Sequence, residues 1–142
     1  MKLSTRPVVK KFKLSFDPTG ETTMTAKQAR TADVIAIANL FAETTRSYDD
    51  EYVGRIEYKQ KWNHEEFKRE CALRTLIELD LEDAETEQPL FRFKEGSYGP
   101  VLAMSGSEFA QAWGILPPEL VDEIFANILE VNPQWGPVLK GE

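Results

Sequence analysis

The residue types that most often carry chemistry are scarce in this chain of 142 residues. It contains one histidine, His64, and one cysteine, Cys71. Zinc sites use these residues in spaced pairs such as CxxC or HxxxH, and neither pair occurs. A Ser–His–Asp or Cys–His mechanism would need His64 as its base, and the sequence around it shows no partner. The phosphate-loop patterns GxGxxG and GxxxxGK[ST] are absent as well. We therefore predict no catalytic residue, no metal site and no cofactor.

Acidic side chains gather in one short segment. The chain has 24 acidic and 17 basic residues, a formal net charge of −7. The acidic surface that we expect consists of Glu78, Asp80, Glu82, Asp83, Glu85 and Glu87. The segment lacks the glycine and the D-x-D-x-D-G spacing of a calcium loop, so a solvated edge is favoured. Its alternative role is to imitate the charge of a nucleic acid and occupy a basic groove of a target protein.

The N-terminus is basic, and no acid precedes Asp17. Its basic residues are Lys2, Arg6, Lys10, Lys11 and Lys13. They suit either a nucleic-acid-binding arm or an edge strand whose lysines discourage pairing with other chains. The net charge favours the edge strand, because non-specific binding to nucleic acid needs a net attraction to phosphate. We therefore predict that neither nucleic acid nor a membrane is a partner.

The elements that position these residues begin with a β-hairpin. Alternating apolar and polar residues predict a strand over Val8–Phe16, the turn Asp17–Gly20 follows, and Glu21–Ala26 is expected to return as a weaker strand. Helical spacing then predicts a helix from Thr31 to Thr44. Its expected buried face consists of Val34, Ile37, Ala38, Phe41 and Ala42.

The middle of the chain gives two competing patterns. Residues from Tyr52 to Trp62 alternate as in a strand. Asn63 resembles a helix cap, and we favour a helix from His64 to about Leu79. The alternative is a long hairpin that pairs Val53–Trp62 with Phe67–Leu81.

The last third has clearer boundaries. Glu82–Pro89 is expected to be an acidic loop, and short strands are expected over Leu90–Lys94 and Val101–Met104. Ser105 or Ser107 should cap a short helix that closes at Gly114. A longer helix should start at Pro117-Pro118 and end at Asn132-Pro133, because the residue before proline avoids helical angles. Its apolar stripe, from Leu120 to Leu129, suits the core or a partner's groove.

These elements predict one α+β domain over residues 1–142. We expect a small antiparallel sheet, a helix after the first hairpin, a middle helix and two C-terminal helices packed on the sheet. Residues 1–6 and 136–142 are expected to be flexible ends. No run approaches the roughly 18 apolar residues of a membrane helix, and the single cysteine suits a reducing, cytoplasmic location.

Three aromatic residues are candidates for contact with a protein partner: Phe109, Trp113 and Trp135. Tryptophan is enriched at protein interfaces, but large aromatic side chains also fill cores. Phe109 and Trp113 share one face of a predicted helix, which suits packing beneath the final helix. Trp135 lies in a turn-rich tail, where a large aromatic side chain must dock on the chain itself or on a partner.

The order of elements resembles the tail assembly chaperones of long-tailed bacteriophages. The resemblance rests on the strand, turn and helix of Lys11–Phe41 and on four motifs: Trp62–Phe67 (WNHEEF), Phe109–Trp113 (FAQAW), Leu116–Leu120 (LPPEL) and Val131–Trp135 (VNPQW). Members of that family are small, often acidic proteins that hold the tape measure protein while the tail tube grows. The resemblance implies a tape measure or tail tube protein as client and the cytoplasm of a bacterial host as location. A second copy of the chain is a further candidate partner.

The leading hypothesis is therefore a non-enzymatic protein that binds and masks a hydrophobic client. An acidic inhibitor or nucleic-acid mimic is the alternative. An enzyme is the least favoured class, since no recognisable constellation of catalytic residues is present.

Overall fold

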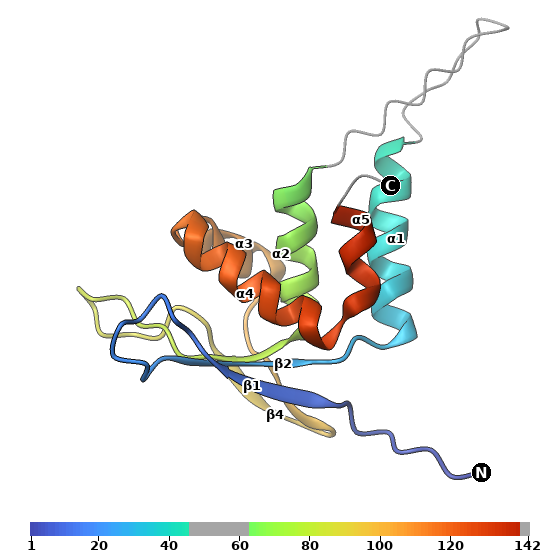
Figure 1. Ribbon diagram of the computed structural model, residues 1–142, viewed down its shortest axis with the longest axis horizontal. Coiled ribbons are helices and arrows are strands. Elements are labelled where there is room, and N and C mark those ends of the chain that lie inside the picture. The colour runs from blue at the N-terminus through green and yellow to red at the C-terminus, as the bar shows by residue number, and fades with distance from the viewer. Residues whose placement is uncertain (46–62, 140–142) are drawn as a thin grey trace, which may run out of the picture.

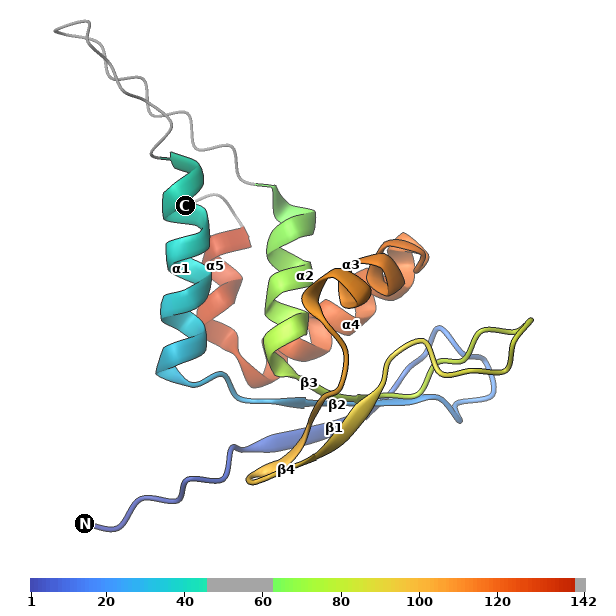
Figure 2. The same ribbon diagram turned by 180° about the vertical axis from the view of Figure 1, so that it is seen from behind.

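The computed structural model describes residues 1–45 and 63–139 (Figure 1). The predicted strand Tyr52–Trp62 lies outside these residues. Within them the chain is an α+β protein, as predicted from the sequence. A three-stranded antiparallel sheet and a two-stranded hairpin combine with helices that cover one face of the larger sheet (Figures 1 and 2).

The N-terminal hairpin forms as predicted. Strand β1 (Val9–Lys13) pairs with β2 (Thr23–Lys27), and the Asp17–Gly20 turn joins them. Gly20 has φ of 70°, a left-handed conformation that glycine adopts without steric cost. The order of strands is β1-β2-β3, so β1 is an edge strand within the described sheet. Lys10, Lys11 and Lys13 therefore lie on an edge strand, whereas Lys2 and Arg6 precede it.

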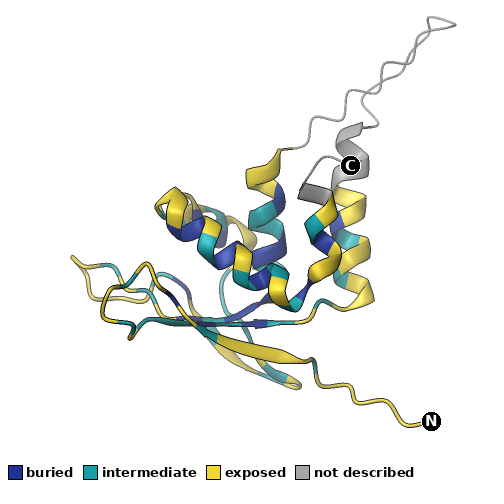
Figure 3. Cartoon of the chain, in the orientation of Figure 1, coloured by how far each residue is buried: buried dark blue, intermediate teal, exposed yellow. Residues whose placement is uncertain are grey.

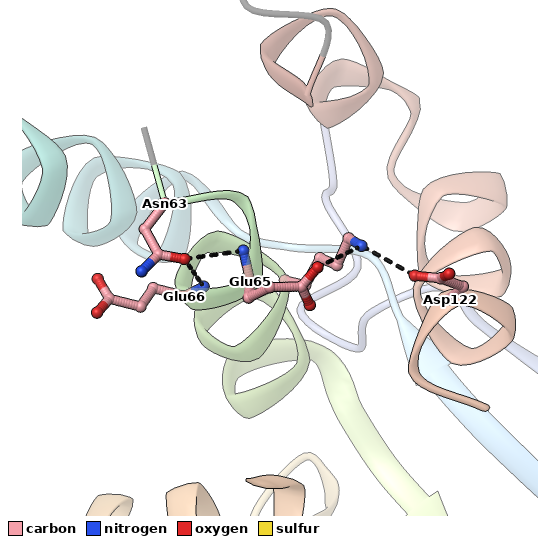
Figure 4. Close-up of polar contacts among 5 residues, drawn as sticks. Asn63, Glu65, Glu66 and Asp122 are labelled. Carbon is pink, nitrogen blue, oxygen red and sulfur yellow. Dashed lines mark hydrogen bonds and ion pairs between the residues drawn. The ribbon is translucent and has the colours of Figure 1, made fainter. Parts of the chain in front are cut away.

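Helix α1 (Thr31–Thr45) follows the hairpin, and α2 (His64–Thr75) begins at the predicted cap. The side-chain oxygen of Asn63 accepts hydrogen bonds from the N–H groups of Glu65 and Glu66, both at 3.1 Å (Figure 4). These bonds satisfy two of the amide groups that a helix leaves unpaired at its start.

The prediction that this helix continues to Leu79 is wrong. It ends at Thr75, and strand β3 (Leu76–Leu79) follows directly and pairs with β2. Leu79 pairs with Met24 and Leu76 with Ala26, with a bulge between the two pairs. The bulge brings leucines three positions apart onto the same buried face, and this spacing imitates a helix in the sequence. The alternative hairpin is wrong for most of Phe67–Leu81, because α2 occupies that segment up to Thr75.

The second hairpin is displaced from its predicted position. Strand β4 (Phe93–Gly96) pairs with β5 (Gly99–Leu102) through a tight turn at Ser97-Tyr98. Pairing therefore includes Glu95, Gly96, Gly99 and Pro100, which lie between the two strands that we expected. Gly99 permits this turn with φ of 109°. The hairpin lies on the side of the sheet away from the helices (Figures 1 and 2).

The C-terminal helices follow the sequence closely. Helix α3 (Gly106–Gly114) starts with a reciprocal cap in which Ser105 and Glu108 bond to each other's backbone N–H. Helix α4 (Pro118–Val131) starts at the predicted proline pair and ends before Pro133. A 3-10 turn, η1 (Pro133–Trp135), leads into the short helix α5 (Gly136–Leu139). We expected residues 136–142 to be a flexible end, but residues 136–139 form this helix.

The core lies between the helices and the sheet, where Figure 3 shows the buried residues (dark blue). Met24 and Ala26 of the central strand are fully buried, although we expected this strand to be the weaker one of the hairpin. The stripe of α4 packs into the same core, as predicted, through Leu120, Val121, Ile124, Phe125 and Ile128. Removal of this apolar area from water stabilises the fold by about 25 cal/mol per Å².

Candidate protein-binding surfaces

The three aromatic residues that we proposed for partner contact lie in the core. Phe109, Trp113 and Trp135 are only 0%, 6% and 3% exposed. The rings of Phe109 and Trp113 stack with centroids 5.7 Å apart, and Trp135 meets the ring of Phe67 edge-on at 6.4 Å. Such pairs are typical of core packing. The structure thus corrects the partner-binding interpretation, because these side chains offer a partner almost no surface.

The predicted acidic surface is divided between two places. Glu78 lies on β3, half-buried, and its carboxylate accepts hydrogen bonds from the hydroxyls of Thr23 at 3.0 Å and Thr25 at 2.9 Å. Asp80, Glu82, Asp83, Glu85 and Glu87 follow in the loop beyond the strand. Glu78 is therefore a structural residue of the sheet, and the acidic surface is confined to the loop.

The histidine and the cysteine do not form a site together. His64 is exposed at the start of α2, whereas Cys71 is fully buried on the same helix. Burial raises the pKa of the Cys71 thiol, so it stays protonated and unreactive. Within residues 1–45 and 63–139, no three histidine, cysteine or acidic residues are grouped to hold a metal ion. None of the described helices is both long and apolar enough to cross a bilayer.

A groove beside α2 is lined by the edge of Trp113. Its volume is about 490 Å³, and residues of α2, α3 and α4 line it. Lys68 crosses it and forms ion pairs with Asp122 at 2.9 Å and Glu65 at 3.2 Å (Figure 4). Burial disfavours the charged form of Lys68, but the hydrogen bonds to Asp122 and Glu65 outweigh it and raise the pKa. Lys68, Asp122 and Glu65 thus satisfy one another in this groove.

Helix α1 exposes apolar side chains around most of its circumference. Its sequence is apolar on every side, which is typical of a helix buried on all sides. Yet of the side chains described on α1, from Thr31 to Leu40, only Ile37 is buried. Val34, Ile35 and Leu40 are 37%, 53% and 41% exposed. The expectation that Val34 and Ala38 pack in the core is therefore wrong, and the side chains of Phe41 and Ala42 lie outside the described part.

The position of α1 explains this exposure. It stands at one end of the helical layer, so neighbours cannot enclose it (Figures 1 and 2). Between Thr31 and Leu40, Asp33 is the only charged residue, and it pairs with Arg74 of α2 at 3.4 Å. We call Val34, Ile35 and Leu40 the α1 surface. It offers a partner apolar contact and almost no charge.

A second groove lies on the face of the sheet that is turned away from the helices, which we call the open face. The β4–β5 hairpin lies on the same side. The groove has a volume of about 620 Å³, and we call it the sheet groove. Val9 of β1, Ile77 of β3 and Val101 of β5 provide apolar walls. The basic side chains of its lining are Arg6, Lys27 and Arg30.

Arg30 holds two sides of the sheet groove together. Its guanidinium lies 5.3 Å from the centre of the Tyr98 ring, at the tip of the β4–β5 hairpin. One of its N–H groups donates to the carbonyl oxygen of Thr5 at 2.5 Å. The basic N-terminus was noted in the sequence, but Lys27, Arg30 and Tyr98 carried no signal that they would meet. These residues come together only through the fold.

No protein-family model, curated protein or solved structure matches this chain.

Proposed function

We propose that this protein is a non-enzymatic binding protein that masks an apolar segment of a client polypeptide with α1. The observation that carries the proposal is a helix apolar on all sides with one buried residue, Ile37, among its described side chains. Exposed apolar area of this kind is unfavourable in water and marks a surface that a partner covers. The near absence of charge on the α1 surface favours an apolar client over an ionic one.

The particular role that we propose is that of a phage tail assembly chaperone acting in the cytoplasm of a bacterial host. Two observations support it: the resemblance in the order of elements and motifs, and an apolar surface on an otherwise acidic protein. An apolar helical client, such as a segment of a tape measure protein, would pack against the side of α1 that presents Val34, Ile35 and the exposed Ala38, as one helix packs on another. The net charge of −7 would keep the complex soluble.

The proposal predicts that a tape measure gene lies beside this gene, and co-expression with the product of that gene tests it. The test variant is Ile35→Glu, which places a charge on the α1 surface. Its matched control is Ile115→Glu, the same change at an isoleucine that is 67% exposed after α3. We expect the parent and Ile115→Glu to co-purify with the client, and Ile35→Glu to lose most of it.

Two results would count against the proposal. If the tape measure protein does not co-purify with the parent chain, the chaperone role is wrong. If it co-purifies equally with Ile35→Glu, the α1 surface is not the docking site. Circular dichroism of both variants shows whether each retains the helical content of the parent.

A further inference from the structure

The sheet groove has a charge opposite to that of the whole molecule. Its lining includes three basic side chains, Arg6, Lys27 and Arg30, and one acidic side chain, Asp33. The carboxylate of Asp33 is already engaged, because it pairs with Arg74 at 3.4 Å and accepts a hydrogen bond from the backbone N–H of Arg30 at 3.0 Å. The basic groups of the groove are therefore left in excess in a chain with net charge −7.

The basic groups stand around an apolar wall. Val9 and Lys27 are paired residues on adjacent strands, so both side chains lie on the open face of the sheet. Ile77 is almost buried on the same side of the molecule, and Val101 closes the groove from the hairpin. A ligand that fits must combine an apolar group, which contacts the apolar wall, with negative charge, which pairs with the basic side chains around that wall.

We propose that the sheet groove binds an acidic segment of a protein partner, which seats an apolar side chain against Val9, Ile77 and Val101 and directs flanking carboxylates to Arg6, Lys27 and Arg30. The argument is charge complementarity, and it is independent of the α1 surface. A groove of about 620 Å³ is large enough for one side chain and its neighbouring backbone.

Arg30 is the anchor that the geometry prepares for a carboxylate. The ring of Tyr98 and the carbonyl of Thr5 hold its guanidinium in place. A guanidinium carries five N–H donors, and a carboxylate accepts two of them in parallel. A side chain that is already ordered loses less entropy when it binds a ligand.

A protein segment fits this groove better than nucleic acid does. Nucleic-acid binding depends on many phosphate contacts along a broad basic face. Here the basic groups of the groove are few, its walls are apolar, and the chain as a whole repels phosphate. Short-range pairing with two or three carboxylates survives that repulsion, because screening removes most of it beyond about 10 Å.

The test is fluorescence anisotropy with a labelled peptide in which one phenylalanine lies between two runs of glutamate. The matched probe replaces every glutamate by glutamine, and the competing probe is a labelled oligothymidylate of equal charge. The test variant is Arg6→Gln with Lys27→Gln, which keeps Arg30 and its structural contacts intact. Its control is Lys10→Gln with Arg69→Gln, which removes the same charge at residues that do not line the groove.

We expect the parent and the control variant to bind the glutamate peptide, and the groove variant to bind it about threefold to tenfold more weakly. Binding should weaken with added salt, and the glutamine peptide should bind more weakly than the glutamate peptide. Equal binding of both peptides, or an equal loss in both variants, would overturn the proposal. Tighter binding of the oligothymidylate would assign the groove to nucleic acid instead. Because Ile35→Glu leaves the groove unchanged, its binding of the glutamate peptide should equal that of the parent, so failure of one proposal leaves the other standing.

Discussion

The backbone N–H of Ala29 donates a hydrogen bond of 2.7 Å to the side-chain oxygen of Asn132. This contact joins the segment before α1 to the end of α4, 103 positions further along the chain. The side-chain amide of Asn132 donates in turn to the carbonyl oxygens of Lys27 and Ile128, at 3.1 and 3.3 Å. Asn132 is fully buried, and its side-chain hydrogen bonds link the last turn of α4 to the segment that precedes α1.

Replacement of Asn132 by alanine should destabilise the fold by about 1–3 kcal/mol, because it leaves part-buried backbone groups at Ala29 and Lys27 without their partner. The control is Gln111→Ala, which removes an exposed amide on α3 and should change stability by less than about 0.5 kcal/mol. Urea denaturation followed by circular dichroism measures both values. Equal stability of the two variants would show that water or a local shift satisfies the freed groups.

Asp17 makes stability depend on pH in the acidic range. Hydrogen bonds from the hydroxyls of Thr22 and Thr19, and from their backbone N–H groups, lower its pKa from 3.8 to about 2. A lowered folded-state pKa means that the carboxylate stabilises the fold above pH 3.8, and that this contribution is lost as pH falls toward 2.

We therefore expect Asp17→Asn to be less stable than the parent at neutral pH, and the difference to shrink between pH 4 and pH 2. Thermal melts across this range measure it. The control is Glu21→Gln, which removes an exposed carboxylate just beyond the same turn and should leave the pH profile of the parent almost unchanged. A difference between parent and Asp17→Asn that stays constant down to pH 2 would contradict the role of the charge.

The caps and breaks of this fold were predictable because each depends on a few adjacent residues. Asn63 and Ser105 form the bonds expected of their positions before a helix, and Asn132-Pro133 ends α4. Strand β3 was not predictable in the same way. Its pairing with β2 joins residues 50 or more positions apart, and the bulge between its two leucines hides the alternation of a strand.

The candidate surfaces were less predictable than the fold. The α1 sequence indicates apolar faces, but only the packing shows that Ile37 is covered and Ile35 is exposed. The sheet groove collects Arg6, Lys27 and Val101 from distant parts of the chain, and no spacing in the sequence brings them together. The aromatic candidates Trp113 and Trp135 failed for a related reason, because residue type alone does not distinguish an interface from a core.

Cys71 should report on unfolding through its reactivity. Its side chain is fully buried, and burial raises the pKa of its thiol, so both access and thiolate formation are suppressed in the folded state. We expect iodoacetamide to label the native protein only at the rate of global or local opening, and to label it rapidly in concentrated urea. Mass spectrometry over time gives both rates. Rapid labelling of the native chain would show that α2 opens readily from the core.

Two isoleucines on α1 provide the sharpest comparison between core and surface. Ile37 is 4% exposed and Ile35 is 53% exposed, two positions apart on the same helix. Ile37→Ala should cost about 2–4 kcal/mol of stability, because it leaves a cavity in the core. Ile35→Ala should change stability by less than about 0.5 kcal/mol, since little buried area is lost and alanine favours the helix. Urea denaturation of the isolated chain distinguishes the two, and if Ile35→Ala costs as much as Ile37→Ala, then another part of the chain covers the α1 surface and no client is needed to explain its apolar character.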